Sequence, residues 1–181
     1  LGAWQVLADV REARGQRAEL INAAAAALAL SPRDSQLRAR VVALTGGTVP
    51  AWLNTAITAR LALDDGHYDE ARANTAQLQA YSIAPIPALL ELEAAWRAGD
   101  TTAAHSLAQS LLVNSPRLVK PRLIMAECLL AAGGSGSEQA VALLHEAEGL
   151  DPAGQVAARL WGDTRRFRML WPAEESEPWS E

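Results

Sequence analysis

Residues 1–34 have the sequence LGAWQVLADVREARGQRAELINAAAAALALSPRD. The stretch contains two segments rich in alanine and leucine, and both residue types favour helix. Gly15 lies between the segments, where a glycine allows the left-handed conformation that ends a helix in a tight turn. The stretch therefore predicts two helices, over residues 2–14 and 17–30, joined by a short turn.

The same features recur along the chain at a nearly constant spacing. Glycines follow predicted helices at Gly15, Gly66, Gly99 and Gly133, and the last three are separated by 33 and 34 residues. Further helices are expected over residues 35–44, 51–63, 68–81, 87–98, 101–113, 119–131, 138–148 and 153–168. A period of this length indicates a chain built from repeated helix pairs.

Proline marks a second position of the repeat. It follows a serine or an aspartate in Ser31-Pro32, Ser115-Pro116 and Asp151-Pro152. Serine and aspartate are frequent N-caps, and a proline at the first helical position loses no hydrogen bond, because that N–H has no acceptor within the helix. We therefore expect each of these prolines to open a helix.

This pattern resembles the tetratricopeptide repeat. The first repeat matches the family's signature at Trp4, Leu7, Ala8, Gly15, Ala27 and Pro32, whereas Leu20 stands where the family prefers alanine. Residues 65–71, DGHYDEA, resemble the family's turn between helices, and small residues are expected at helix contacts at Ala71, Ala104, Ala126 and Ala140. The resemblance implies an all-α fold, a right-handed α-solenoid of antiparallel helix pairs with about ten helices.

The repeat spacing is interrupted once. Gly15 and Gly66 are 51 residues apart, and residues 45–50, TGGTVP, separate two predicted helices. We therefore expect one repeat plus an extra helix at residues 1–44, a break or linker at 45–50, and repeats with a C-terminal capping helix at 51–170. Residues 171–181 form an acidic tail with two tryptophans, which we expect to fold back on a groove or to dock on a neighbouring molecule.

Composition limits the possible functions. The chain has 181 residues, a net charge of −5 and a single lysine, so no nucleic-acid surface is expected. Its longest apolar run, residues 23–30, is too short for a membrane span. Abundant alanine and arginine indicate a bacterial source. Because the helical pattern is already present at the first residue, we expect a piece of a longer protein, in the cytoplasm or as a periplasmic or membrane-anchored soluble domain.

Motifs for catalysis and metal binding are not apparent in the sequence. His67, His105 and His145 have no second histidine or cysteine three or four residues away, so no zinc site is expected. The chain contains neither a phosphate-binding loop nor a GxSxG motif. We therefore expect no enzyme activity, no cofactor and no metal.

The first helix of each pair is expected to line a concave groove, as the family resemblance implies. Counting from the turn glycines predicts that the groove is lined by Arg60, Leu63, Leu89, Glu93, Trp96, Leu123, Glu127, Leu130, Arg159 and Arg166. Trp96 is the best candidate for a dominant contact, with a core position as the alternative.

Such a groove combines an apolar stripe with alternating charges, which suits a helical or extended peptide segment. We therefore expect a protein–protein interaction scaffold with a protein or peptide partner. Two alternatives stay open. One is an accessory domain of a larger bacterial enzyme or membrane-assembly protein, and the other is a self-assembling structural module.

Overall fold

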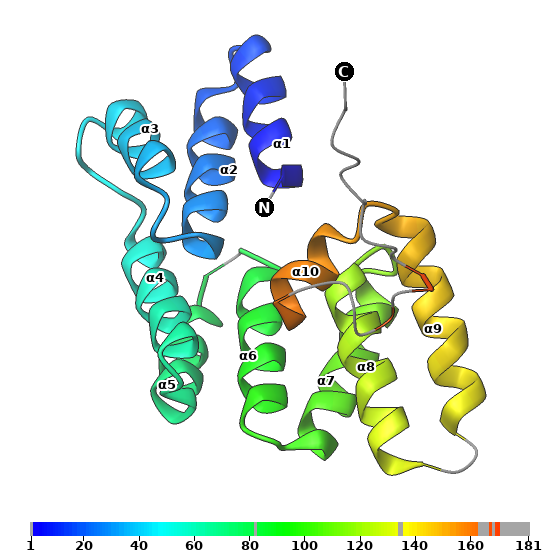
Figure 1. Ribbon diagram of the computed structural model, residues 1–181. Helices are drawn as coiled ribbons and strands as arrows, with labels where there is room; N and C mark the ends of the chain where they lie inside the picture. Colours follow the sequence, from blue (N-terminus) through cyan, green and yellow to red (C-terminus); the bar gives the residue numbers. More distant parts are fainter. Residues whose placement is uncertain (1, 82, 134–135, 163–166, 168, 171–181) are drawn as a thin grey trace, which may run out of the picture. The chain divides into compact units, whose positions relative to one another are not determined.

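The computed structural model describes residues 2–81, 83–133, 136–162, 167, 169 and 170 (Figure 1). These residues form ten helices and no strand, which confirms the predicted all-α class. The helices are α1 (Gly2–Ala13), α2 (Arg17–Leu30), α3 (Ser35–Thr45), α4 (Ala51–Asp64), α5 (Tyr68–Leu78), α6 (Ile86–Arg97), α7 (Thr101–Asn114), α8 (Val119–Ala132), α9 (Gly136–Leu150) and α10 (Gln155–Trp161). None of them is long and apolar enough to cross a membrane.

Helices α1 to α9 lie within three residues of their predicted bounds. The four turn glycines at positions 15, 66, 99 and 133 all have positive φ angles, between 67° and 82°. The prediction for the last helix, residues 153–168, is wrong, because α10 ends at Trp161. Gly162 follows it in the left-handed conformation, with φ 86°, which stops the helix. Residues 163–166, 168 and the predicted tail at 171–181 lie outside the described residues.

The prolines do not open helices, which corrects the sequence prediction. Each lies at the second position of a four-residue turn, three residues before the next helix begins. The turns are closed by backbone N–H groups of Asp34, Leu118 and Gly154, which donate to carbonyls of Ser31, Ser115 and Asp151 at 3.0, 3.1 and 2.8 Å. Proline suits the second position of such a turn because its φ angle is already fixed at the required value.

The division of the chain into two compact units falls after Gly99, giving a first unit, Leu1–Gly99, and a second unit, Asp100–Glu181. The residues predicted as a break, 45–50, lie within the first unit, where they include the loop between α3 and α4. Both of these helices contact α2. The extra helix α3 is also tied to α1, because Arg40 makes ion pairs with Asp9 and Glu12 at 2.8 and 2.7 Å.

Helix α2 is the centre of one half of the first unit. It contacts α1, α3 and α4, and every residue from Ala23 to Ala29 is buried. Its alanine side chains are small enough for neighbouring helices to pack closely on several sides. In the other half of the unit, α4 contacts α5 and α6, and α5 contacts α6.

Helix α8 has the central position in the second unit. It contacts α7, α9 and α10, and all eight residues from Pro121 to Cys128 are buried. Trp161, at the end of α10, packs against Phe167 with ring centroids 5.1 Å apart.

Candidate binding surface

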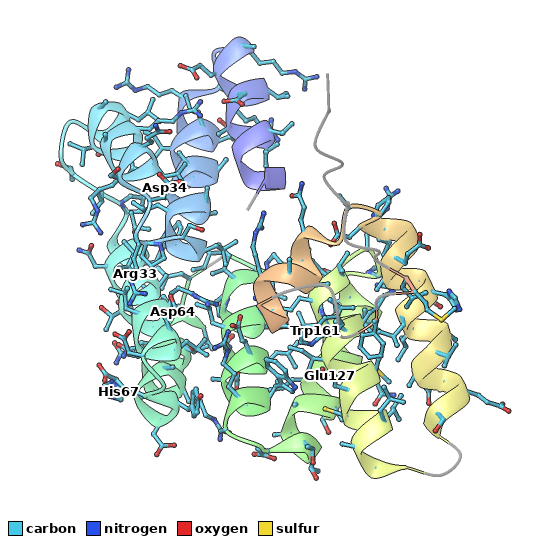
Figure 2. The ribbon with its side chains drawn as sticks, in the orientation of Figure 1. Arg33, Asp34, Asp64, His67, Glu127 and Trp161 are labelled. Carbon is cyan, nitrogen blue, oxygen red and sulfur yellow. The ribbon has the colours of Figure 1, made fainter. Side chains whose placement is uncertain are left out.

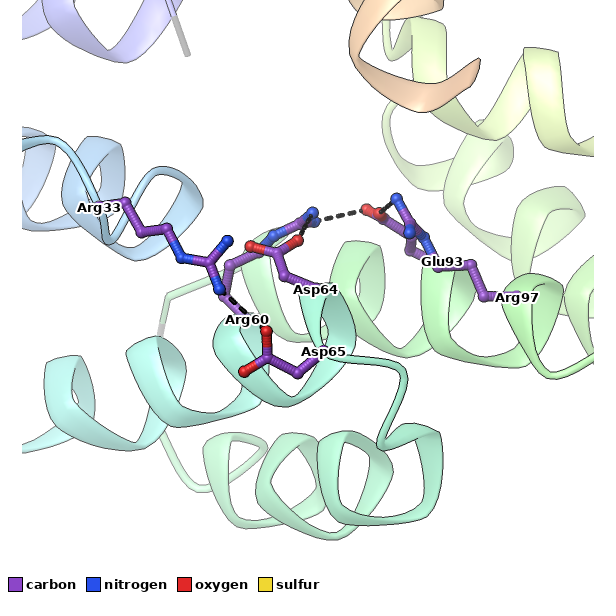
Figure 3. Close-up of polar contacts among 6 residues, drawn as sticks. All are labelled: Arg33, Arg60, Asp64, Asp65, Glu93 and Arg97. Atoms are coloured by element: carbon purple, nitrogen blue, oxygen red, sulfur yellow. Dashed lines mark hydrogen bonds and ion pairs between the residues drawn. The ribbon is translucent and has the colours of Figure 1, made fainter. Parts of the chain in front are cut away.

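Helices α4 and α6 of the first unit are joined by a charged network centred on Glu93 (Figure 3). Glu93 lies on α6 and is only 1% exposed. Arg60 of α4 donates from Nη1 to Glu93 Oε2 at 2.8 Å. Arg97, one turn further along α6, forms an ion pair from Nη2 to Glu93 Oε1 at 2.9 Å. Both oxygens of the buried carboxylate are therefore occupied by guanidinium groups.

Asp64 completes the network, because it forms a hydrogen bond and an ion pair with Arg60 from the next turn of α4. Burial acts to lower the pKa of Arg60, but the charges of Glu93 and Asp64 and their hydrogen bonds outweigh it, so that the pKa is raised. A buried charge is costly unless it is paired and hydrogen-bonded. Here the pairing of two positive with two negative side chains offsets this cost and holds α4 against α6, although Arg97 Nε is buried without a hydrogen-bond partner.

A second ion pair near this network is exposed. Arg33, in the turn after α2, contacts Asp65 at 2.9 Å, with the two side chains 68% and 52% exposed (Figure 3). Water screens such a pair, so its contribution to stability is small. The exposed Arg33–Asp65 pair therefore contributes less to stability than the buried Arg60–Glu93 pair, although their N–O distances, 2.9 and 2.8 Å, are nearly equal.

Leu89 and Trp96 lie on the same side of α6 as Glu93, because they are four residues before it and three residues after it. Both side chains are partly exposed. They are separated by two helical turns, or about 10.5 Å along the axis. The α4–α6 surface, defined here by Arg60, Asp64, Leu89, Trp96 and Arg97, thus places two apolar side chains beside a fixed set of charges.

A shallow cleft of about 620 Å³ opens at the end of this surface. It is lined by Gly66, His67, Tyr68, Asp69, Glu70, Arg97 and Ala98. The first five residues form the turn into α5 and its first helical residues, and the last two form the end of α6. His67 is largely exposed in that turn (Figure 2).

The predicted groove residues of the first unit divide into three groups. Arg60 and Glu93 are brought together in the buried network. Leu89 and Trp96 keep part of their surface exposed. Leu63 is fully buried in the hydrophobic core. A side chain without exposed surface cannot touch a partner, so Leu63 packs the core and does not line a binding surface.

The predicted residues of the second unit are placed as follows. Leu123 is fully buried and Glu127 is nearly so, both on α8. Leu130 is 39% exposed near the end of α8, and Arg159 is exposed on α10. Arg166 lies outside the described residues. Leu123 is therefore a core residue as well, and partner contact by Glu127, Leu130, Arg159 and Arg166 stays a prediction.

Two polar features of the network were missed in the sequence, namely Asp64 and Arg97. Each lies four residues from a residue that was selected, at the spacing of side chains that meet on one helix face. That spacing was a usable signal. The buried Arg122 of α8 had no such signal in the sequence. Its Nε donates to Glu146 of α9 at 2.9 Å, and these two residues are 24 positions apart, too far for helical spacing to connect them.

The remaining reactive groups of the described residues do not form a metal site, since no group of three or more histidine, cysteine, aspartate or glutamate side chains is suitably placed there. Cys128 of α8 is buried and directly follows Glu127 in the chain. Burial, followed by the charge of Glu127, raises the pKa of this thiol. The thiol is therefore held in its protonated, unreactive form at neutral pH.

Comparisons of the chain with models of protein families, with curated proteins and with solved structures gave no match. The resemblance to tetratricopeptide repeats therefore rests on the residue pattern.

Proposed function

We propose that this chain is a protein–protein interaction scaffold that binds a helical or extended peptide segment on the α4–α6 surface. One observation carries the proposal. Leu89 and Trp96, two partly exposed apolar side chains, lie on the face of α6 that a buried ion network anchors to α4. Large apolar side chains on a rigid support bind partners well, because little conformational entropy is lost on association.

The order of helix contacts supports the same proposal. In the first unit α4 contacts α5 and α6, and α5 contacts α6, so that α4 meets its next and its next-but-one neighbour. This order is expected of stacked helix pairs, and we propose a right-handed solenoid of the tetratricopeptide type. In that family's arrays the first helix of each pair lines the binding surface, and α4 and α6 are the helices that this resemblance assigns to it. The proposal includes no catalytic step and no cofactor.

A selection from a displayed peptide library tests the proposal. The full chain serves as the target, and dissociation constants of the selected peptides are then measured for Trp96→Ala and Leu89→Ala. We expect Trp96→Ala to weaken binding by about 30-fold, as a dominant interface residue does. Tyr81→Ala is the matched control, because Tyr81 is an exposed aromatic residue of the same unit. Peptides that bind both α6 variants as tightly as the unchanged chain would contradict the proposal.

The self-assembling alternative is favoured by a different observation. Helix α1 exposes Val6 and Val10, four residues apart, and α3 exposes Val42. Adjacent exposed apolar side chains mark contact sites for other proteins or for other copies. Light scattering over a range of concentrations would detect this self-association, and Val6→Ser together with Val10→Ser should abolish it. A concentration-independent monomer mass would exclude this alternative.

A further inference from the structure

The charges around the α4–α6 surface are unequal. Residues 51–99 contain three arginines and six acidic residues. Arg60 and Arg97 are engaged with Glu93 and Asp64, and these four side chains have no net charge together. The acidic residues that are not part of the network are Asp65, Asp69, Glu70 and Glu91, of which Asp65 is paired with Arg33, and the third arginine of this segment is Arg72. Four carboxylates thus stand against the two arginines Arg33 and Arg72. The surroundings of the surface therefore carry an excess of negative charge.

Two of these acidic residues lie where a partner would meet them. Asp69 and Glu70 are exposed and line the cleft at the end of α6, together with the aromatic residue Tyr68. Arg97 and Ala98 line the other side of the cleft and directly follow Trp96. A contact with Trp96 would therefore bring a bound segment to the opening of the cleft.

Two further groups at the cleft favour a positive charge, and the partial positive charge of the N-terminus of α5, about half a unit, is smaller than the charge of Asp69 and Glu70. The end of α6 contributes the partial negative charge of its last carbonyl groups. An aromatic ring such as that of Tyr68 attracts a cation that approaches its face. Arg97 does not cancel these effects, because its guanidinium group is already paired with Glu93 at 2.9 Å. An acidic segment would be repelled here by Asp69 and Glu70.

We propose that the partner is a basic amphipathic segment. This inference rests on the proposed function and names the chemistry of its ligand. Apolar side chains of the segment contact Leu89 and Trp96, and a lysine or arginine of the segment enters the cleft between Asp69, Glu70 and Tyr68. The spacing of about 10.5 Å along α6 corresponds to two turns of a bound helix or to about three residues of an extended peptide.

Three synthetic peptides of about 18 residues test this inference. They share leucines and a reporter dye at the same positions, and their polar positions are all lysine, all glutamine or all glutamate. Binding to the full chain is measured by fluorescence anisotropy at low salt and again at high salt. We expect the lysine peptide to bind at least about ten-fold more tightly than the glutamine peptide at low salt, and to lose this advantage at high salt.

Matched variants separate a local effect from general charge attraction. Asp69→Asn with Glu70→Gln removes two negative charges at the cleft with little change of shape. Glu138→Gln with Glu148→Gln removes the same charge in the second unit, on α9. The inference requires that the first pair weakens binding of the lysine peptide by about ten-fold and that the second pair leaves it nearly unchanged. An equal loss with both pairs overturns it.

The outcomes distinguish this inference from the proposed function. If the glutamine or glutamate peptide binds as tightly as the lysine peptide and its binding still depends on Trp96, the partner is not basic, and the proposed function stands. If no peptide binds, or if binding is insensitive to Trp96→Ala and Leu89→Ala, the proposed function is wrong for this surface, and the inference is wrong with it. Thermal unfolding of each variant checks that it is folded.

Discussion

Helices α2 and α8 have equivalent central positions, since each contacts three other helices of its own unit, yet they are built from different residues. The buried run of α2 is made of alanines and one leucine. The buried run of α8 includes large apolar side chains and two charged ones, Arg122 and Glu127. The first unit places its buried charge elsewhere, in the network around Glu93 between α4 and α6.

The comparison shows two ways to surround one helix with others. Small side chains allow close contact on every side, but they bury little apolar area per residue. Larger side chains bury more area, and polar groups among them must then find partners. The stability of the two units should therefore change by different amounts when buried residues are replaced by larger, smaller or uncharged ones.

The largest effect is expected at the buried charge of the first unit. Glu93→Ala leaves the guanidinium groups of Arg60 and Arg97 next to each other without their shared carboxylate. We expect a loss of about 3–5 kcal/mol in the free energy of unfolding, measured by urea denaturation. Asp65→Ala removes a carboxylate from the exposed pair with Arg33 and should cost less than about 1 kcal/mol. If Glu93→Ala and Asp65→Ala lowered the free energy of unfolding equally, burial would not determine how much an ion pair stabilises this chain.

The next effect concerns the small residues of α2. Ala27 is fully buried, so Ala27→Leu forces the neighbouring helices apart or into strained side-chain conformations. We expect a destabilisation of about 1–3 kcal/mol. Ala18→Leu is the control, because Ala18 is exposed on the same helix and the two residues have similar helix propensity. An unchanged melting temperature for Ala27→Leu would mean that α2 is not closely packed.

A smaller effect is expected at Arg122 in α8. Its side chain donates to Glu146 and to the carbonyl oxygen of Leu118, each at 2.9 Å, but Glu146 is 57% exposed. Glu146 can therefore return to water when Arg122 is removed. We expect Arg122→Met, which keeps much of the apolar stem, to cost about 1 kcal/mol in thermal or urea unfolding. If Arg122→Met lowered the free energy of unfolding as much as Glu93→Ala, the buried charges of Arg122 and Glu93 would be equally important for stability.

The smallest effect concerns Cys128. Because its pKa is raised in the folded chain, the folded state holds the thiol proton more strongly than the unfolded state does. The stability linked to this proton is present below the ordinary thiol pKa and is lost as the pH rises through the raised value. We expect iodoacetamide to label the native chain far more slowly than the chain in urea at about pH 8.5.

The same experiment has a clear control. Cys128→Ala should abolish labelling and remove the part of the pH dependence of stability that belongs to the thiol. Labelling of the native chain at the rate of the unfolded chain would mean that Cys128 is accessible to the reagent.

Local patterns allowed most of the helices to be predicted but not all of their ends. The glycines at positions 15, 66 and 99 ended helices as expected, because a left-handed glycine acts within one turn of chain. The sequence pattern placed Pro32, Pro116 and Pro152 at the start of a helix, whereas each lies in the turn before it. Proline fits both the first position of a helix and the second position of a turn. Only hydrogen bonds such as that from Asp34 to Ser31 distinguish the two.

The candidate surface was predictable only in part. Helical spacing placed Leu89, Glu93 and Trp96 on one face of α6, and it placed Arg60 on the corresponding face of α4. It did not distinguish Leu63 and Leu123, which are buried, from Leu130, which is exposed. Periodicity gives the direction of a side chain from its own helix, whereas burial depends on which other helices lie in that direction.

The sequence by itself determined that the chain is helical, roughly where each helix lies and which residues share a helix face, because propensity, capping and the 3.6-residue period act over a few neighbouring residues. The tertiary structure alone decided which charges are buried and paired. Arg60 and Glu93 are 33 residues apart in the chain, and their partnership exists only because α4 packs against α6. Packing between distant segments is also what makes α2 and α8 central helices.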